Sequence, residues 1–312
     1  MSETTRQRPV RIGTRSSPLA LAQAHEVKQR LLAAHTCYAE SDIEIVPMST
    51  KGDRIQNRAL SELGGKGLFT EEIENGLLDG SLDIAVHSMK DMPTVLPDGL
   101  GIICMLERED VRDTFISDKA PSLAALAPGA LVGTASLRRQ AQVLRQRPDL
   151  RVETFRGNVQ TRLRKLHEGV ADATLLALAG LNRLGMTDVA TAIIDSDTML
   201  PAIAQGALGI EARLGDAEMS RLLLPLDHAG TRHCVNAERA LLAALDGSCR
   251  TPIAGLATLR DGRIRLRGEI LTPDGRLHHT TEREGPVSDA AAMGWDAGEE
   301  LRRRGGPDFF RT

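Results

Sequence analysis

A single thiol stands in a small-residue turn toward the end of the chain. Cys249 follows Gly247 and Ser248 and precedes Arg250. A cysteine in such a turn is accessible, and a neighbouring guanidinium favours the thiolate, which is the nucleophilic form of the side chain. No CxxC or metal-ligand spacing connects it to the other cysteines, which are Cys37, Cys104 and Cys234. The pattern indicates an attachment point for a ligand, with an inert loop cysteine as the alternative.

Arginines recur in three segments in which a strand is expected to end and a helix to begin. These segments are residues 11–17, 133–139 and, less regularly, 155–162. Arginine presents a rigid fork of N–H donors that matches carboxylate or phosphate oxygens, and a helix N-terminus adds oriented backbone N–H groups. Because α/β domains bind ligands at the carboxyl ends of their strands, the three turns predict a cleft for several carboxylates. For the basic residues between 131 and 165, the alternative is a solvated helix face with scattered charge.

A lysine and an aspartate follow another expected strand. Residues 82–87 show a buried strand pattern, and Lys90 and Asp91 come shortly after it, before Pro93. An isolated Lys-Asp pair is by default a surface ion pair. At the exit of a central strand, Asp91 can instead face the cleft and stabilise a developing cation, as an electrostatic catalyst does.

The composition is that of a soluble globular protein and limits the classes of ligand. The chain has 312 residues, enough for two or three domains, and a net charge of only −3. Aromatic residues make up 2% of it, which disfavours binding of single-stranded nucleic acid by base stacking. Residues 64–69 lack the spacing of a P-loop, and His228, His233 and Cys234 lack a fourth zinc ligand. The N-terminus has no signal-peptide pattern and no apolar run spans a bilayer, so we expect a cytoplasmic protein without metal, nucleic-acid or membrane partners.

Short apolar strand patterns alternate with amphipathic helix patterns over the first two thirds of the chain, which predicts α/β layers. The segment 200–210 is expected to return the chain to the first layer, giving two solute-binding-protein-like α/β domains with a double crossover and a cleft between them. From residue 229, a helix, three strands separated by Asp-Gly turns and a final helix predict a small α+β domain. The predicted domains are residues 1–105 with 205–225, residues 106–204, and residues 226–312.

Six motifs together resemble the porphobilinogen deaminase (hydroxymethylbilane synthase) family over nearly the whole chain. They are residues 11–15 with 17–21, 86–91, 133–139, 156–159, 200–201 with 205–206, and 247–252. The resemblance implies a monomeric transferase of porphyrin and haem biosynthesis. Such an enzyme condenses four porphobilinogen molecules head to tail with loss of ammonia and then releases hydroxymethylbilane with water. The resemblance also implies a dipyrromethane cofactor joined to Cys249 by a thioether.

The resemblance further implies roles for individual side chains. Asp91 would contact the pyrrole N–H groups at the reacting ring, and Phe69 would cover that ring. Acetate and propionate groups would be bound by a basic and hydroxyl set, namely Arg11, Arg15, Ser17, Lys66, Lys90, Thr134, Ser136, Arg138, Arg139, Arg156, Arg162 and Arg183. Family members often carry a lysine in the loop before the Gly-Lys pair, where residues 61–63 are Ser-Glu-Leu. This departure bears on one basic contact and leaves the chemistry unchanged.

The chemistry of the substrate fits this set of residues. Porphobilinogen carries an acetate and a propionate on each pyrrole, so every added ring adds negative charge that a cleft of arginines can bind. Loss of ammonia leaves an electron-poor methylene pyrrole, whose charge Asp91 can stabilise. The alternative from another class is a two-domain anion-binding receptor without enzymatic activity, which shares the doubly crossed layout. The missing signal peptide and the third domain with its lone thiol disfavour a receptor.

Overall fold

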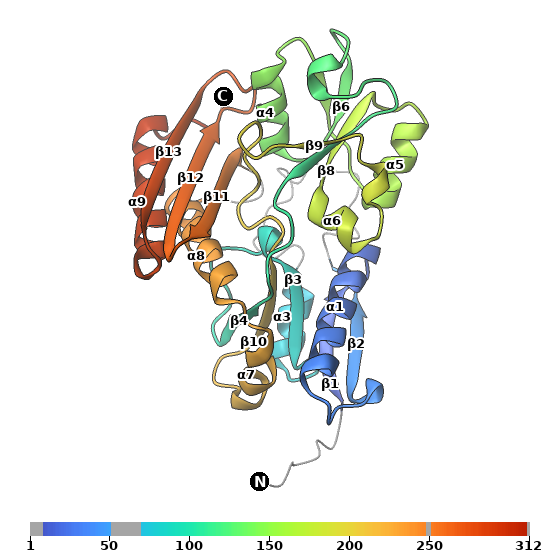
Figure 1. Cartoon of the computed structure of the whole chain (residues 1–312), viewed down its shortest axis with the longest axis vertical. Coiled ribbons are helices and arrows are strands. Elements are labelled where there is room, and N and C mark those ends of the chain that lie inside the picture. The colour runs from blue at the N-terminus through green and yellow to red at the C-terminus, as the bar shows by residue number, and fades with distance from the viewer. Residues whose placement is uncertain (1–8, 51–69, 248–250, 311–312) are drawn as a thin grey trace.

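Three β-sheets with helices packed against them organise the chain in the computed structural model, which describes residues 9–50, 70–247 and 251–310 (Figure 1). The first sheet has the strand order β2-β1-β3-β10-β4, in which β1 runs parallel to β2 and β3, and β10 runs antiparallel to β3 and β4. Its strands are β1 (Val10–Arg15), β2 (Ile43–Met48), β3 (Ile84–Ser88), β4 (Leu100–Met105) and β10 (Leu208–Arg213). Its helices are α1 (Pro18–Ala34), α3 (Glu71–Leu78) and α7 (Ala217–Leu223).

The second sheet repeats this arrangement with the strand order β7-β6-β8-β5-β9. Strand β6 runs parallel to β7 and β8, whereas β5 runs antiparallel to β8 and β9. Its strands are β5 (Asp113–Ile116), β6 (Leu131–Gly133), β7 (Arg151–Glu153), β8 (Ala173–Ala177) and β9 (Ala192–Ile194). Its helices are α4 (Leu137–Gln146), α5 (Val159–His167) and α6 (Leu178–Arg183).

The third sheet is an antiparallel meander against which two long helices pack. It consists of β11 (Ile253–Arg260), β12 (Arg263–Leu271) and β13 (His278–Pro286), with α8 (Ala229–Ala244) and α9 (Ala290–Gly305). The β11–β12 hairpin turns at Asp261 and Gly262, which both have positive φ, as a two-residue type I′ turn requires. The predicted Asp-Gly hairpin at this position is confirmed. One-turn 3₁₀ helices complete the described fold: η1 (Glu40–Asp42), η2 (Met89–Asp91), η3 (Leu123–Ala125), η4 (Thr187–Val189), η5 (Leu224–Leu226) and η6 (Val287–Asp289).

Two neighbouring segments connect the first and second sheets. Residues 106–112 lead from β4 to β5, and residues 195–207 lead from β9 back to β10. Their backbones approach closely, because a Cβ added to Gly206, whose φ is +87°, would lie 2.4 Å from the carbonyl oxygen of Glu109. The predicted fold class, two doubly connected α/β units with a small α+β unit, is therefore confirmed. The exact domain boundaries stay a prediction.

The third unit shares a hydrophobic core with the first. Met89, Met92 and Met105 of the first unit and Ile203 of the second connection belong to one buried cluster with side chains of α8, α9 and the third sheet. The cores of the two α/β sheets are separate clusters. The turn that carries Asp91 is therefore embedded in the interface with the C-terminal unit. Among the described residues, no helix combines the length and apolar character needed to cross a membrane.

Candidate active site

A cleft of about 640 Å³ opens where β1, β3, β6 and β8 end. This is the edge at which α/β sheets bind ligands, and the volume is that of a small-molecule site. Among the described residues, its lining includes six basic side chains and one carboxylate: Arg15, Lys90, Arg139, Arg156, Arg162, Arg183 and Asp91. Each of these seven was predicted from the sequence as a site residue, and the structure brings them together around one cavity. The charge pattern suits a ligand with several carboxylates.

Asp91 lies on η2, the single 3₁₀ turn that follows β3. The side chains of Met89 and Met92 are 1% and 4% exposed, whereas Asp91 between them is exposed and lines the cleft. The backbone N–H of Met89 donates to the carbonyl of Ala207 at 3.0 Å, and that of Met92 donates to the carbonyl of Met89 at 3.3 Å. Two buried methionines thus hold the turn in place and present Lys90 and Asp91 to the cavity.

The basic residues of the cleft lower one another's proton affinity. Burial lowers the pKa of Lys90 to about 8; Asp91 opposes this fall, and Arg139 adds to it. Burial, together with the charges of Arg139 and Arg156, lowers the pKa of Arg162 to about 10. Burial is the main cause of both shifts, and the neighbouring arginines add to it by repulsion. A bound carboxylate would relieve this repulsion.

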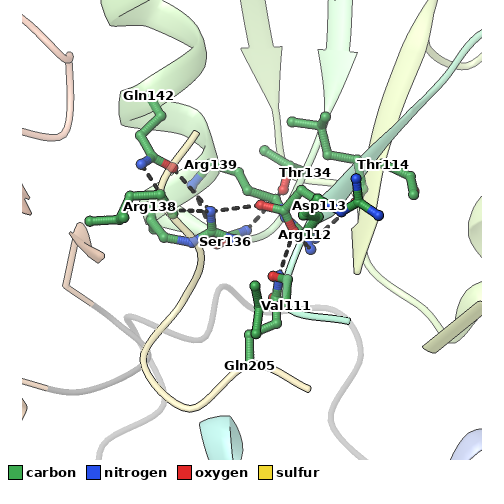
Figure 2. A network of polar contacts seen from close by, with 12 residues as sticks. Val111, Arg112, Asp113, Thr114, Thr134, Ser136, Arg138, Arg139, Gln142 and Gln205 are labelled. Carbon is green, nitrogen blue, oxygen red and sulfur yellow. Dashed lines mark hydrogen bonds and ion pairs between the residues drawn. The ribbon is translucent and has the colours of Figure 1, made fainter. Parts of the chain in front are cut away.

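The turn between β6 and α4 holds two arginines on one buried carboxylate (Figure 2). Asp113, which is fully buried, accepts from Nη1 of Arg138 and from Nη2 of Arg139, each at 2.7 Å. Burial raises the pKa of Asp113, but the two guanidinium groups outweigh it and hold that pKa far below the usual range. Gln205, from the second connection, donates from Nε2 to the same carboxylate at 3.0 Å. Arg139 lines the cleft, whereas Arg138 is buried beneath it and does not.

Two hydroxyls of this turn serve its backbone. Ser136 caps α4 by accepting from the N–H of Arg139, and Thr134 accepts at Oγ1 from the N–H of Ser136. Neither residue belongs to the cleft lining. The structure therefore places Thr134, Ser136 and Arg138 around Arg139, and not against the cavity.

The turn between β1 and α1 distributes its residues differently. Ser17 caps α1 by accepting from the N–H of Ala20 at 3.3 Å and lines the cleft beside Arg15. Arg11 does not reach the cleft. Its guanidinium donates to the carboxylate of Asp83, at 3.4 Å from Nε, and to the carbonyl of Gly80.

The third turn places its arginines with backbone contacts. Asn158 caps α5 by accepting from the N–H of Thr161 at 2.8 Å. Gly157 has a φ of +125°, which favours glycine, and its carbonyl accepts from Nε of Arg162 at 2.9 Å. Arg156 and Arg162 both line the cavity. The predicted helix start after Asn158 is confirmed.

Arg183 reaches the cleft already bound to a carboxylate of the opposite unit. Its Nε donates to Glu26 of α1 at 3.0 Å, its Nη2 donates to the carbonyl of Gly206 at 3.2 Å, and its side chain is 8% exposed. Glu26 also accepts from Arg30 at 2.9 Å. This ion pair connects α6 of the second unit to α1 of the first.

Sequence reasoning missed several polar residues of the cleft, above all Gln23. This side chain is 4% exposed, lines the cavity and donates to Oγ of Ser88 at 2.9 Å, close to Asp91 in the chain. Gln23 shares the buried face of α1 with Ala24, Val27 and Leu31. A glutamine on an otherwise apolar helix face was the available signal, because a buried amide requires polar partners.

Three predicted residues lie outside the described part of the chain: Lys66, Phe69 and Cys249. Of the described cysteines, Cys104 and Cys234 are buried, and burial raises the pKa of their thiols to about 12 and about 11. Cys37 is exposed. Within the described ranges, no group of three or more His, Cys, Asp and Glu side chains is placed to hold a metal ion.

Comparisons with known proteins agree with this geometry. A family model described as "Porphobilinogen deaminase, dipyromethane cofactor binding domain" matches residues 10–221, and one described as "Porphobilinogen deaminase, C-terminal domain" matches residues 232–303. A protein from Paracoccus denitrificans named porphobilinogen deaminase is 58% identical over 304 residues, which cover 97% of each chain.

Two solved structures are similar to part of the chain. A periplasmic substrate-binding protein of an ABC transporter from Coxiella burnetii has 14% identity and a TM-score of 0.43, covering 72% of this chain and 94% of that chain. A nutrient-binding protein from Burkholderia cenocepacia has 12% identity and a TM-score of 0.42, covering 69% and 90%. At TM-scores below 0.5 these similarities carry no argument about function.

Proposed function

The chain belongs to the porphobilinogen deaminase family, and we propose that Asp91 is its catalytic group and Cys249 the residue that carries its dipyrromethane cofactor. The protein is a transferase of porphyrin and haem biosynthesis. It condenses four porphobilinogen molecules head to tail with loss of ammonia and releases hydroxymethylbilane. The family, the activity and the cofactor predicted from the sequence are thereby confirmed. A receptor without enzymatic activity is not favoured.

The residues of the cleft fit a dipyrromethane. Such a group carries an acetate and a propionate on each ring, and the cleft presents six basic side chains with one carboxylate among its described lining residues. Burial and neighbouring arginines lower the pKa of Lys90 and of Arg162, and bound carboxylates would stabilise the charged form of both side chains. When bound, the cofactor supplies the pyrrole carbon to which the first substrate is joined. We assign its carboxylates, and those of the substrate, to Arg15, Ser17, Lys90, Arg139, Arg156 and Arg162.

Asp91 supplies the electrostatic part of the reaction. As ammonia leaves porphobilinogen, positive charge develops on the methylene pyrrole, and a fixed carboxylate beside it lowers the energy of that state. The same carboxylate can accept hydrogen bonds from pyrrole N–H groups. The observation that carries this assignment is that Asp91 is the one acid among the described lining residues, held on a turn between two buried methionines.

The other predicted carboxylate-binding residues receive supporting roles in this proposal. Arg138, Thr134 and Ser136 hold Arg139 in place, and Arg11 holds Asp83. Arg183 lines the cleft and shares its guanidinium with Glu26. Lys66 and Phe69 keep the roles that family membership implies, which are carboxylate binding and cover of the active ring.

Cys249 is supported as the attachment point by the surroundings of the other thiols. Burial raises the pKa of Cys104 and Cys234, which suppresses their thiolates. Cys37 follows the far end of α1, whose N-terminus lines the cleft. A helix of this length separates its ends by about 25 Å, so Cys37 is remote from the cavity.

The test combines kinetics with intact mass on the same protein samples. Asp91→Asn should keep the cofactor mass and lose about two to four orders of magnitude in kcat. Cys249→Ser should fold without the additional mass and without activity, because a hydroxyl is a much weaker nucleophile than a thiolate. Replacing Cys37, Cys104 or Cys234 by Ser should leave the cofactor attached. Exposed Asp118→Asn is the charge-matched control, and parental turnover of Asp91→Asn would overturn the assignment.

We also propose that the protein is a cytoplasmic monomer that does not bind nucleic acid and that its domains divide at residues 105, 204 and 225. The net charge of −3 and the basic side chains gathered in the cleft argue against nucleic-acid binding. Sedimentation equilibrium at several concentrations tests the monomer. A mass that rises with concentration would contradict it.

A further inference from the structure

Arg239 reaches from α8 of the C-terminal unit to the backbone that follows Asp91. Its Nη1 donates to the carbonyl of Met92 at 3.3 Å, and its Nη2 donates to the carbonyl of Pro93 at 2.6 Å. The side chain is largely buried, and burial lowers the pKa of its guanidinium. Both contacts therefore join helix α8 to the two residues that come directly after the proposed catalytic aspartate.

This arginine differs from its neighbours in the same interface. Arg108 pairs with Glu238, and Arg232 pairs with Asp227. Arg239 forms no ion pair with any residue that the structure describes, and its hydrogen-bond acceptors there are the two carbonyls. Burying a charge without a counter-ion is unfavourable. The two backbone carbonyls that accept from its guanidinium thus explain why Arg239 is buried here.

The contacts around Asp91 show how the guanidinium of Arg239 contributes to the position of this turn. On the N-terminal side, the turn is fixed by the N–H of Met89 on the carbonyl of Ala207. Met89 and Met92 fill the core shared with α8, which fixes their side chains. On the C-terminal side, the peptide groups of Met92 and Pro93 are held by Arg239. Without it, the backbone next to Asp91 loses the hydrogen bonds that set its direction.

Helix α8 also leads to the proposed attachment point. Its last turn is continued by Gly247, whose N–H donates to the carbonyl of Leu242 at 3.0 Å. Cys249 follows Arg239 by ten residues. A single helix thus contacts the backbone after Asp91 and precedes the proposed attachment point in the sequence.

We propose that Arg239 is a positioning residue for the reaction, which holds the backbone after Asp91 so that the carboxylate keeps a fixed place relative to the helix leading to Cys249. This inference rests on the proposed role of Asp91. Electrostatic stabilisation depends on the distance between the carboxylate and the developing charge, and a displacement of about 1 Å can lower a rate about 100-fold.

The first experiment separates positioning from general support. Arg239→Met should lower kcat about 10- to 100-fold, keep the cofactor mass and leave KM for porphobilinogen within about twofold, because the carboxylate-binding arginines are untouched. Arg239→Lys should recover part of kcat, since an ammonium can hold one of the two carbonyls. Arg232→Met is the matched control, because Arg232 lies on the same helix and donates to the carbonyls of Ile102 and Ile103, away from Asp91. It should lower the melting temperature and keep kcat.

The second experiment asks whether Arg239 acts through Asp91. Adding Arg239→Met to Asp91→Asn should lower the single-turnover rate by a further factor of less than about two. The asparagine carries no charge, so its exact position matters little to the rate. Equal losses of kcat in both backgrounds, or in Arg239→Met and Arg232→Met alike, would overturn the positioning role. A slow Asp91→Asn with a fully active Arg239→Met would overturn only this inference, whereas a fully active Asp91→Asn would overturn the role of Asp91 itself. If Arg239→Met does not fold, Arg239→Lys carries the same comparisons.

Discussion

The turn that leads from β1 to α1 and the turn that leads from β6 to α4 resemble each other in sequence and are built differently. In the first, Arg11 and Arg15 lie four residues apart on one strand, which separates them by about 13 Å, so only Arg15 reaches the cleft. In the second, Arg138 and Arg139 are neighbours at the start of a helix and share Asp113. There, only Arg139 lines the cavity.

The difference shows that an arginine in a strand-exit turn can bind a ligand, support the sheet or support another arginine. In both turns, a carboxylate from elsewhere in the chain holds the arginines that it contacts. Asp83, which binds Arg11, is 72 residues away, and Asp113 is 25 and 26 residues from its two partners. The local motif predicts where basic residues gather. The position of each guanidinium relative to the cleft decides which of them meets a ligand, since Arg139 lines the cavity while it is paired with Asp113.

The strongest test of this comparison is the loss of one ligand-binding arginine from each turn. Arg15→Ala and Arg139→Ala should each lower kcat/KM about 100-fold or more, because each removes a preorganised charge-assisted donor. Intact mass after a limiting amount of porphobilinogen should show a block near primer assembly or the first additions. Arg139→Ala should also lower the free energy of unfolding, since it leaves Asp113 with one guanidinium partner. A block at the last addition in either variant would contradict their place in the cleft.

Arg11→Met should have the opposite profile. It removes a partner of the buried Asp83 but leaves that carboxylate the N–H of residue 11 and the more distant Arg213. We expect the free energy of unfolding to fall by about 2 kcal/mol, with kcat/KM within twofold of the parent. Urea denaturation and steady-state kinetics measure the two effects. A loss of activity at unchanged stability would place Arg11 in the binding site after all.

Local chemistry explains which elements were predictable. Helices α1, α4 and α5 begin after Ser17, Ser136 and Asn158 as expected, because an N-cap depends on residues within one turn. Helices α6 and α7 and the edge strand β9 were not predicted. They are short, and their stability comes from packing against distant segments that no local pattern shows.

The site divides in the same way. Asp91, Arg15 and Arg139 lie at or shortly after the ends of strands and were predictable from that position. The surroundings of Arg11, Arg183 and Arg239 were not, because their partners lie far away in the sequence. Hydrophobic periodicity carries no information about such pairs.

A smaller effect is expected from the ion pair that crosses between the units. Glu26→Gln should free Arg183 for a ligand carboxylate and speed the late additions about two- to fivefold, the range of a partly exposed ion pair. Arg30→Ala should slow the late additions. The structure shows two arginines bound to Glu26, and without Arg30 the carboxylate would bind Arg183 more strongly. The masses of partly extended protein at limiting substrate measure both changes. In an Arg183→Ala background, Glu26→Gln should leave the rate of the late additions unchanged. A changed rate there would show that Glu26 does not act through Arg183.

The smallest expected effect is a pH dependence of substrate affinity, which arises from Lys90 on the side of the cleft formed by the first unit. Its pKa of about 8 means that a bound carboxylate meets a charged ammonium below pH 8 and a neutral amine above it. Affinity for the substrate should therefore fall a few-fold, by about 1 kcal/mol or less, as the pH rises through 8. Lys90→Arg should remove this phase, because a guanidinium stays charged, whereas Lys90→Gln should bind weakly at every pH.

The free energy of unfolding should rise with pH where the affinity falls. This distinguishes Lys90 from a group whose titration lowers the affinity by destabilising the folded protein. The unfolded chain has a lysine pKa near 10.4, so between pH 8 and that value it binds more protons than the folded protein. The Lys90 contribution to the free energy of unfolding therefore rises with pH across this window. Urea denaturation of the parent and of Lys90→Arg between pH 7 and 10 measures the difference. Affinity and stability falling together in the parent would show that another group titrates.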